Sequence, residues 1–247
     1  MNALTTNMAD CAVSHERYDG ARLIAALAGR DIRSIRMNFR RLLELHDIRA
    51  VIMVGASASG KTTLVNAVRS ALAADRDLGR QFTVPIRIIT RPVRQNDDQG
   101  ENIFVTANQF DMMVSQGSIA LRWIRLMEAG RTEAYGFRRC EDDRIHVYSA
   151  NNGLIYNEAS VKPEGCLSGA LIVLVYCPDQ TRKVRLEVRS PDIIVGRPAE
   201  ASFRLQDRCI GLYPQAHLLM KNFGRYQSTS TCDVVELLRA IYEMKRG

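Results

Sequence analysis

A short segment that starts at residue 55 contains the glycines, lysine and hydroxyl group that a phosphate-binding loop needs. It reads Gly-Ala-Ser-Ala-Ser-Gly-Lys-Thr over residues 55–62 and fits G-x-x-x-x-G-K-[ST] at every position. The glycines let the backbone curl so that several N–H groups converge on one phosphate. The lysine ammonium reaches the terminal phosphates, and the Thr62 hydroxyl is a ligand for Mg²⁺. The motif therefore predicts a site for a nucleoside triphosphate, with ATP and Mg²⁺ as the expected cofactors.

The segments on both sides of this loop have the periodicity that such a site requires. Ala50–Val54 is a continuous apolar run, which is typical of a buried strand in a parallel sheet. Thr62–Ala74 carries apolar residues along one face, which predicts a helix whose positive end points at the anion. Lys61 is the expected catalytic residue and Thr62 the expected metal ligand. The predicted nucleotide contacts are Gly55, Ser57, Ala58, Ser59, Gly60, Lys61, Thr62 and Thr63.

The rest of the chain alternates predicted strands with predicted helices. We expect strands at Phe82–Thr90, Ile119–Trp123, Ile145–Ala150, Leu171–Tyr176 and His217–Lys221, and helices at Asn108–Ser115, Asp179–Val188, Ala199–Tyr213 and Thr231–Lys245. Such alternation is typical of a parallel sheet covered on both faces. We therefore expect an α/β P-loop NTPase three-layer fold with a five-stranded parallel sheet over residues 49–247. Residues 1–48 are expected to form an N-terminal helical extension of one or two amphipathic helices.

Composition excludes several other classes of protein. The six cysteines include no C-x-x-C pair and the four histidines show no metal-ligand spacing, so reduced thiols and structural histidines are expected. No apolar run is long enough to cross a bilayer, and Met1–Asp10 lacks the pattern of a secretory signal, so the expected location is cytoplasmic with no membrane partner. The net charge is +7 without basic runs interleaved with aromatics, which argues against a nucleic-acid partner. A homodimer is left open.

Two arginines at the end of a predicted strand could hold a second anion. Thr90-Arg91-Pro92-Val93-Arg94 leads into the polar, turn-rich segment Gln95–Gly100. Arginines three residues apart at a strand end can face one phosphate, because each offers a planar fork of N–H donors. The competing interpretation is a pair of solvated surface arginines.

From this point the sequence resembles the guanylate-kinase-like branch of the nucleoside monophosphate kinases, over about Val51 to Ile241. Gly100 lies six residues after Arg94, as in that branch. The further matching segments are Gly100-Glu101-Asn102, Ala120-Leu121-Arg122-Trp123, Tyr135-Gly136, Arg185-Leu186 with Arg189, Arg204-Leu205 and Asn222-Phe223-Gly224. The resemblance implies a small acceptor-binding subdomain at about residues 90–140 and an arginine-bearing lid at about 189–199.

The resemblance also implies roles for individual residues. Arg91 and Arg94 would hold the phosphate of a small phosphorylated acceptor, a sugar phosphate or a nucleoside monophosphate. Arg189 and Arg197 would act with Lys61 in catalysis, while Arg185 and Arg204 would complete the lid. The alternative for the lid arginines is a set of surface ion pairs. The implied substrate-binding residues are Arg91, Arg94, Glu101, Trp123, Tyr135 and Asn151.

Within this branch the sequence looks more like the ribose 1,5-bisphosphate phosphokinases than the guanylate kinases. Ile103 stands where guanylate kinases carry a tyrosine, and Ser149 and Asn151 stand where their third strand carries aspartates. Arg122 replaces a carboxylate that accepts hydrogen bonds from guanine, which a guanidinium cannot do. The expected activity is transfer of the ATP γ-phosphate, with ribose 1,5-bisphosphate as the favoured acceptor. The alternatives are a divergent guanylate kinase acting on GMP, a catalytically silent nucleotide-binding module, or a hydrolase or switch. Trp123 fits substrate stacking and a core position equally well.

Overall fold

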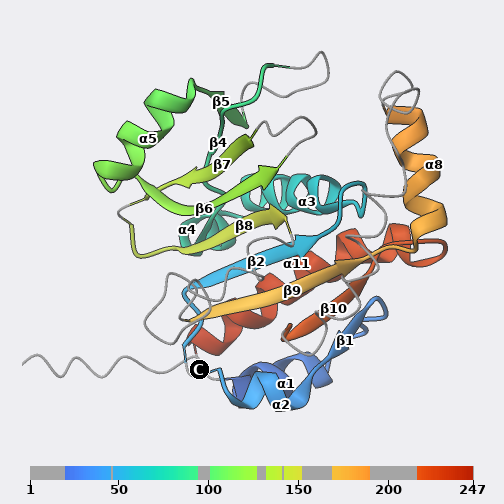
Figure 1. The fold of residues 1–247 in the computed structure, drawn as a ribbon. Coiled ribbons are helices and arrows are strands. Elements are labelled where there is room, and N and C mark those ends of the chain that lie inside the picture. Colours follow the sequence, from blue (N-terminus) through green and yellow to red (C-terminus); the bar gives the residue numbers. More distant parts are fainter. Residues whose placement is uncertain are drawn as a thin grey trace, which may run out of the picture.

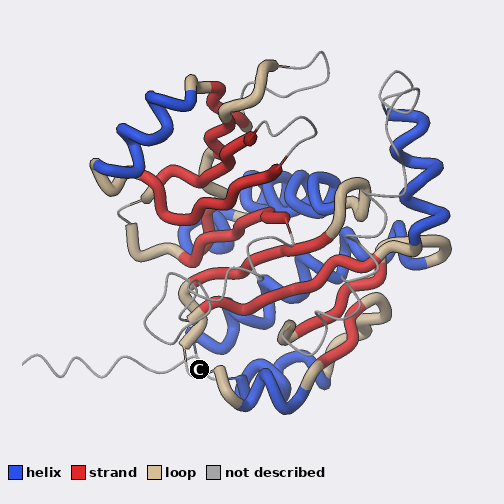
Figure 2. Tube along the Cα trace, in the orientation of Figure 1, coloured by secondary structure: helices blue, strands red, loops and turns tan. Residues whose placement is uncertain are grey.

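The structure is a computed structural model. It describes residues 20–45, 47–93, 101–126, 132–140, 142–151, 169–189 and 216–246. Two β-sheets lie one above the other, and most of the helices cover the far side of the larger sheet (Figures 1 and 2). The predicted helix at Ala199–Tyr213 and the predicted loop at Gln95–Gly100 lie outside the described residues.

The larger sheet has the strand order β1-β10-β9-β2-β8-β3. Its strands are β1 (Ile35–Met37), β2 (Ala50–Gly55), β3 (Phe82–Thr83), β8 (Ile145–Asn151), β9 (Ala170–Tyr176) and β10 (Leu218–Lys221). All but β1 run parallel to their neighbours. The central strands β2 and β9 are continuous apolar runs because both of their faces are buried.

Strand β1 is a correction to the expectation of a purely helical N-terminal extension. It pairs antiparallel with β10 and gives the sheet a sixth strand beyond the expected five. Only three residues form it, too few to show a period of two in the sequence. The pairing covers the edge of β10, which would otherwise present unpaired backbone groups.

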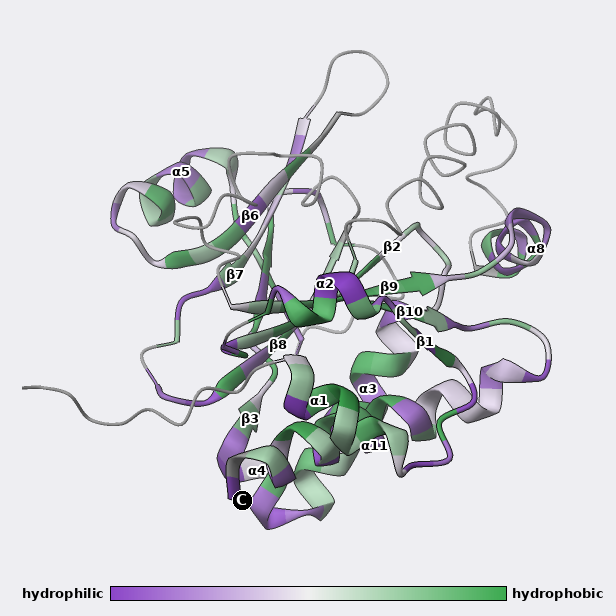
Figure 3. Ribbon diagram, turned by 90° about the horizontal axis from the view of Figure 1, so that it is seen from below, coloured by the Kyte–Doolittle hydropathy of each residue, from purple (hydrophilic) through white to green (hydrophobic). Residues whose placement is uncertain are grey.

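The helices beneath this sheet bury its lower face. They are α1 (Gly20–Ala28), α2 (Phe39–Leu43), α3 (Lys61–Ala74), α4 (Arg76–Gln81) and α11 (Tyr226–Arg246). Helices α1 and α11 are in contact, and Figure 3 shows them close together with stretches coloured as hydrophobic in both. Leu23 and Leu42 from the N-terminal segment belong to the same buried cluster as Leu237 and Ile241 of α11. Residues 20–45 are thus packed into the core of the main sheet.

Two helix boundaries differ from the sequence-based expectation. Helix α4 was not predicted, and Asp75 begins it by accepting hydrogen bonds from the N–H groups of Asp77 and Leu78. Helix α11 begins at Tyr226 rather than Thr231. The beginning of this helix is rich in serine and threonine. Because these residues are typical of loops and turns, the sequence pattern did not indicate a helix there. Here hydroxyls such as that of Ser230 donate to carbonyls one turn back instead.

The smaller sheet has the order β5-β4-β7-β6 and lies above the larger one in Figure 1. Its strands are β4 (Arg87–Ile89), β5 (Asn102–Phe104), β6 (Ile119–Leu126) and β7 (Thr132–Arg138). Helix α5 (Ala107–Ser115) starts with a capping box formed by Thr106 and Gln109. Its Phe110 packs with Ile88 and Ile119 on the outer face of this sheet. The inner face packs against the main sheet in a second buried cluster.

The predicted strand at Phe82–Thr90 is wrong in one respect, because it forms two strands in two different sheets. Phe82–Thr83 pairs with β8, whereas Arg87–Ile89 pairs with β5 and β7. Pro85 lies between them and has no N–H group to donate to a ladder. The chain therefore passes from the larger to the smaller sheet at this point.

Helix α8 (Asp179–Arg189) follows β9 and stands at the edge of the molecule (Figure 1). Its bounds agree with the helix expected at Asp179–Val188 to within one residue. In the described part of the chain, no helix is both long enough and apolar enough to cross a membrane.

Candidate functional site

The phosphate-binding motif lies between β2 and α3, at the carboxyl edge of the parallel strands. Gly55 ends β2, and Lys61 begins α3 directly after Gly60. Gly60 has a φ of 95°, and a Cβ there would lie 1.9 Å from Nδ2 of Asn222. Only glycine meets both conditions, which explains the second glycine of the motif.

Ala58 also lies in the left-handed region, with a φ of 59°. This conformation costs a residue with a side chain roughly 1–2 kcal/mol, whereas glycine adopts it freely. The backbone geometry therefore favours glycine at this position, although the chain carries alanine. The strain in the loop is retained because neighbouring side chains hold its carbonyl groups.

Three consecutive carbonyl groups of the loop are held from behind by side chains of α8 and of the residue after β10. Arg182 Nε donates to the carbonyl oxygen of Ser57 at 2.9 Å, and Arg185 Nη1 donates to that of Ala58 at 3.3 Å. Asn222 Nδ2 donates to the carbonyl oxygen of Ser59 at 2.9 Å. We call these three side chains the clamp.

The clamp determines where the amide groups of the loop point. A trans peptide is planar, so its carbonyl oxygen and the next N–H group point in opposite directions. Holding the carbonyls of Ser57 and Ser59 therefore turns the N–H groups of Ala58 and Gly60 away from the clamp. Neither of these two N–H groups has an acceptor among the described residues. The arrangement is a cradle of amide donors for an anion.

The members of the clamp are themselves fixed by further contacts. Asn222 is 3% exposed and accepts a hydrogen bond from Ser230 Oγ at 3.2 Å. Its backbone N–H donates to the carbonyl oxygen of Tyr176, at the end of β9. Arg182 is 2% exposed and pairs with Asp179. Arg185 also donates to the carbonyl oxygen of Asn222, which links α8 to the end of β10.

The loop residues that would contact a triphosphate fit that ligand. Lys61 Nζ donates to the carbonyl oxygens of Gly55 and Ala56 at 2.8 and 2.7 Å, so its ammonium lies over the loop. The buried Ser59 hydroxyl has no hydrogen-bond partner in the described part of the chain. Thr62 and Thr63 are exposed on the first turn of α3, where the positive helix end favours an anion. These residues could hold ATP, and the Thr62 hydroxyl would serve as a ligand of its Mg²⁺.

Arg91 is buried at the end of β4, which excludes the interpretation as a solvated surface arginine. It is 8% exposed, and its guanidinium carbon lies 5.5 Å from the centre of the Phe104 ring. Arg91 Nη1 donates to the carbonyl oxygen of Pro92 at 2.8 Å. The preceding Thr90 is fixed to β7, because its hydroxyl accepts from the N–H of Ala134 at 2.8 Å. The other arginine of this segment, Arg94, lies outside the described residues.

Glu101 and the aromatic pair Trp123 and Tyr135 all have partners within the protein. The Glu101 carboxylate pairs with Arg69 of α3 and so ties the smaller sheet to the helix after the phosphate loop. The Trp123 and Tyr135 rings stack at 5.5 Å with an interplanar angle of 6°. Both are at most 9% exposed within the core between the sheets. Trp123 thus has the core position that the sequence left as one of two alternatives.

The remaining candidates can be placed only partly. Asn151 ends β8 and pairs with Gly55 of β2, so its backbone lies beside the start of the loop. Arg189 ends α8. The structure describes the backbone of Asn151 and Arg189 but not their side chains. Arg197 and Arg204 lie outside the described residues. Their proposed roles stay predictions.

Sequence reasoning did not assign the clamp roles of Arg182 and Asn222. Arg182 lies three residues before Arg185 and hence on the same side of α8, which is a signal that could have been used. Asn222 directly follows β10, at the same edge of the sheet where Gly55 ends β2. Glu133, which accepts a hydrogen bond from the Tyr135 hydroxyl at 2.6 Å, was also not assigned.

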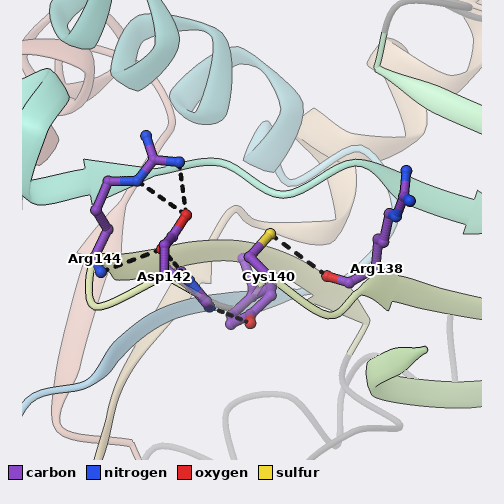
Figure 4. A network of polar contacts seen from close by, with 6 residues as sticks. Arg138, Cys140, Asp142 and Arg144 are labelled. Atoms are coloured by element: carbon purple, nitrogen blue, oxygen red, sulfur yellow. Dashed lines mark hydrogen bonds and ion pairs between the residues drawn. The ribbon is translucent and has the colours of Figure 1, made fainter. Parts of the chain in front are cut away.

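A second polar cluster lies at the opposite, amino end of β8 (Figure 4). Hydrogen bonds from Arg144 and a contact with His146 lower the pKa of Asp142 to about 2, against the opposing effect of burial. His146 also contacts the Tyr148 hydroxyl at 2.9 Å. These contacts are internal to the cluster, and no group of metal-binding side chains occurs within the described ranges. The prediction of a structural His146 is consistent with this arrangement.

His217 and Cys177 also have shifted pKa values, and both make contacts within the described core. Burial, followed by the charge of Arg41, lowers the pKa of His217 to about 4, and its Nδ1 accepts from the N–H of Ile172. Burial raises the pKa of the Cys177 thiol beside the clamp. Cys140, Cys177 and Cys232 are free thiols, as expected for these three of the six cysteines.

The chain was compared with known proteins by sequence and by fold. No family model matches the chain. The chain is 28% identical over 142 residues to the ribose 1,5-bisphosphate phosphokinase PhnN of Rhodopseudomonas palustris, covering 58% of this chain and 67% of that protein. The crystal structure of guanylate kinase from Anaplasma phagocytophilum superposes with a TM-score of 0.50 at 11% identity, covering 78% of this chain and 85% of that one. In sequence the chain is thus similar to a ribose 1,5-bisphosphate phosphokinase, and in fold it is similar to a guanylate kinase.

Proposed function

We propose that this protein is an ATP-dependent phosphotransferase that moves the γ-phosphate of ATP to a small phosphorylated acceptor, with ribose 1,5-bisphosphate favoured. The observation that carries the proposal is the cradle of amide groups in the loop at residues 55–62. The clamp holds three carbonyl groups of this loop by hydrogen bonds. Phosphoryl transfer depends mainly on positioning and on neutralising charge, and this loop is built for both.

The residues divide into a nucleotide half and an acceptor half. The N–H groups of the loop and Lys61 would bind the β- and γ-phosphates. Mg²⁺, held through the Thr62 hydroxyl and waters, would neutralise charge on the transferred phosphoryl group. In the other half, the buried guanidinium of Arg91 would bind the phosphate of the acceptor as a rigid fork. Arg189 and Arg197 are proposed to act in the lid.

Two observations favour a sugar phosphate over GMP. The relative in sequence is a ribose 1,5-bisphosphate phosphokinase, by its name. In addition, Arg122 is exposed and alternates with the buried Leu121 and Trp123, so its side chain lies on the opposite face of β6 from theirs. A donor-only side chain on that face does not replace the carboxylate that reads guanine. GMP remains the second candidate acceptor because the fold is that of a guanylate kinase.

The experiment is a coupled assay of ADP release from Mg-ATP with ribose 1,5-bisphosphate, ribose 5-phosphate, GMP and no acceptor in parallel. The expected result is release that depends on ribose 1,5-bisphosphate and is abolished in Lys61→Ala. Dependence on GMP instead would select the guanylate kinase alternative. Release without an acceptor would indicate a hydrolase. Nucleotide binding without release in any reaction would indicate the silent module.

A further inference from the structure

The inner face of the smaller sheet carries a carboxylate next to the arginine that is proposed to bind phosphate. Strand β7 pairs with β4 through Ile89 and Tyr135. The N–H of Thr90 then donates to the carbonyl oxygen of Ala134 at 3.1 Å, while the N–H of Ala134 donates to the Thr90 hydroxyl, so the backbone ladder ends at this pair. Arg91 and Glu133 are the next residues along the two segments, directly beyond these last paired residues.

Glu133 lies on the face of β7 that is turned toward the main sheet. Side chains alternate along a strand, and Tyr135 and Phe137 belong to the buried cluster between the sheets. Glu133 continues this row at the beginning of β7, where its own exposure is intermediate. Its backbone pairs with Arg125 near the end of β6. In Figure 1 the arrowheads of β6 and β8 point the same way, toward the side that carries the phosphate loop.

The Glu133 carboxylate is held in a defined orientation. The Tyr135 hydroxyl donates to Glu133 Oε2 at 2.6 Å, which is in the range of a charge-assisted hydrogen bond. The Tyr135 ring is in turn stacked on Trp123, so the hydroxyl cannot swing away without breaking the stack. An ionised carboxylate has about four lone-pair sites, and it can accept from Tyr135 and from other donors at the same time.

A carboxylate repels phosphate, so its place beside Arg91 indicates a ligand that is anionic in one part and a hydrogen-bond donor in the next. In a sugar phosphate, hydroxyl groups lie within a few bonds of the phosphorylated carbon. A nucleoside monophosphate carries hydroxyl groups on its own ribose at the same distance, whereas the N–H groups of its base lie on the far side of the sugar. A carboxylate close to Arg91 therefore matches the hydroxyl groups of a sugar and not the N–H groups of a base.

We propose that Glu133 is a specificity residue of the acceptor site that accepts hydrogen bonds from sugar hydroxyl groups beside the phosphate bound by Arg91. The proposal rests on the proposed transfer to a phosphorylated acceptor and names the part of the acceptor that is recognised, the hydroxyl groups of its phosphorylated sugar. It also gives the stacked Trp123 and Tyr135 a role in the site, because they position the carboxylate without touching the acceptor.

The test compares a sugar acceptor with its deoxy analogue on the full chain. Calorimetry would give the dissociation constants of ribose 1-phosphate and 2-deoxyribose 1-phosphate, which differ in the hydroxyl group next to the phosphorylated carbon, for the unaltered protein, Glu133→Ala and Glu133→Gln. A hydrogen bond to a charged group contributes roughly 1.5–3 kcal/mol, so Glu133→Ala should weaken binding of the ribose compound about tenfold to a hundredfold. Binding of the deoxy compound should change little. Glu133→Gln keeps a carbonyl acceptor and should recover part of the difference.

Controls separate this role from positioning and from folding. Asp111→Asn removes an exposed carboxylate from α5, on the outer side of the same sheet, and should alter neither constant. Thermal unfolding of each variant checks the fold. A Glu133→Ala protein that loses both sugars equally would mean that Glu133 only orients Arg91 or Tyr135, and the proposal would be refuted. It would also be overturned if the unaltered protein bound both sugars alike, or if Glu133→Gln changed the ratio of GMP to IMP affinity instead.

The outcome is distinguishable from failure of the proposed function. Binding selectivity is measured without ATP, so a chain that discriminates the two sugars but releases no ADP would keep this assignment and lose the proposed catalysis. A chain that phosphorylates GMP and ignores both sugars would keep a kinase activity and lose this assignment.

Discussion

Asn222 allows a direct test of the clamp, because its two polar side-chain atoms make different hydrogen bonds. Nδ2 holds the Ser59 carbonyl and Oδ1 accepts from Ser230. In Asn222→Ala, the buried Ser59 carbonyl loses its donor, which costs roughly 1–3 kcal/mol. Ser230 retains its bond to the carbonyl oxygen of Gln227 and adds little. We therefore expect the free energy of unfolding to fall by about 2 kcal/mol.

The isosteric change Asn222→Asp separates loop orientation from packing. It keeps the side-chain volume but places an oxygen where Nδ2 now faces the Ser59 carbonyl. The two oxygens would repel, the peptide would turn, and the Gly60 N–H would leave the cradle. A negative charge would also be added beside the phosphate site. We expect Asn222→Asp to bind ADP at least tenfold more weakly, equivalent to about 1.4 kcal/mol, and more weakly than Asn222→Ala.

Urea unfolding and calorimetric titration with Mg-ADP measure the two quantities on the same preparations. Thr229→Ala is a matched control, because its hydroxyl caps a nearby turn of α11 without contacting the loop. The reasoning would be refuted if Asn222→Asp bound ADP as tightly as the unaltered protein. Equal loss in the Asp and Ala variants would show that volume, and not the orientation of the Ser59 peptide, controls the loop.

Three further predictions concern the two halves of the site and the core. Lys61→Ala should reduce phosphoryl transfer at least a hundredfold with little loss of fold, since charge stabilisation in such sites contributes roughly 3–4 kcal/mol; activity within tenfold would contradict it. Arg91→Lys keeps the charge but not the fork, so it should raise the KM for the acceptor and leave the KM for ATP nearly unchanged. The pKa of His217 falls from 6.5 to about 4 on folding, so the unfolded chain binds more protons between these values. Stability should therefore be fully present above pH 6.5 and decline toward pH 4, by up to about 3 kcal/mol for this group. Urea unfolding of His217→Gln across that range should show a correspondingly smaller decline.

The sequence alone determined the features that depend on neighbouring residues. The apolar run of β2, the loop at residues 55–62 and the amphipathic α3 are consecutive, so their patterns specified the nucleotide half of the site. The same holds for β8, β9, α5 and α8, whose observed bounds lie within one or two residues of those expected. Local propensity and hydrophobic period act within one element and can be read directly from it.

The tertiary structure decided whatever depends on contacts between distant segments. Arg182 and Asn222 reach the loop across 125 and 163 residues, and no local pattern marks such partners. Likewise, the three-residue β1 exists only because β10 offers an edge, and Pro85 divides a strand whose halves have different partners. Glu133 becomes a candidate for acceptor recognition only when strand register sets it beside Arg91 and the Tyr135 hydroxyl. Pairing register and side-chain packing are settled by the whole fold, so the sequence could place the nucleotide but not the groups that orient its loop or select its acceptor.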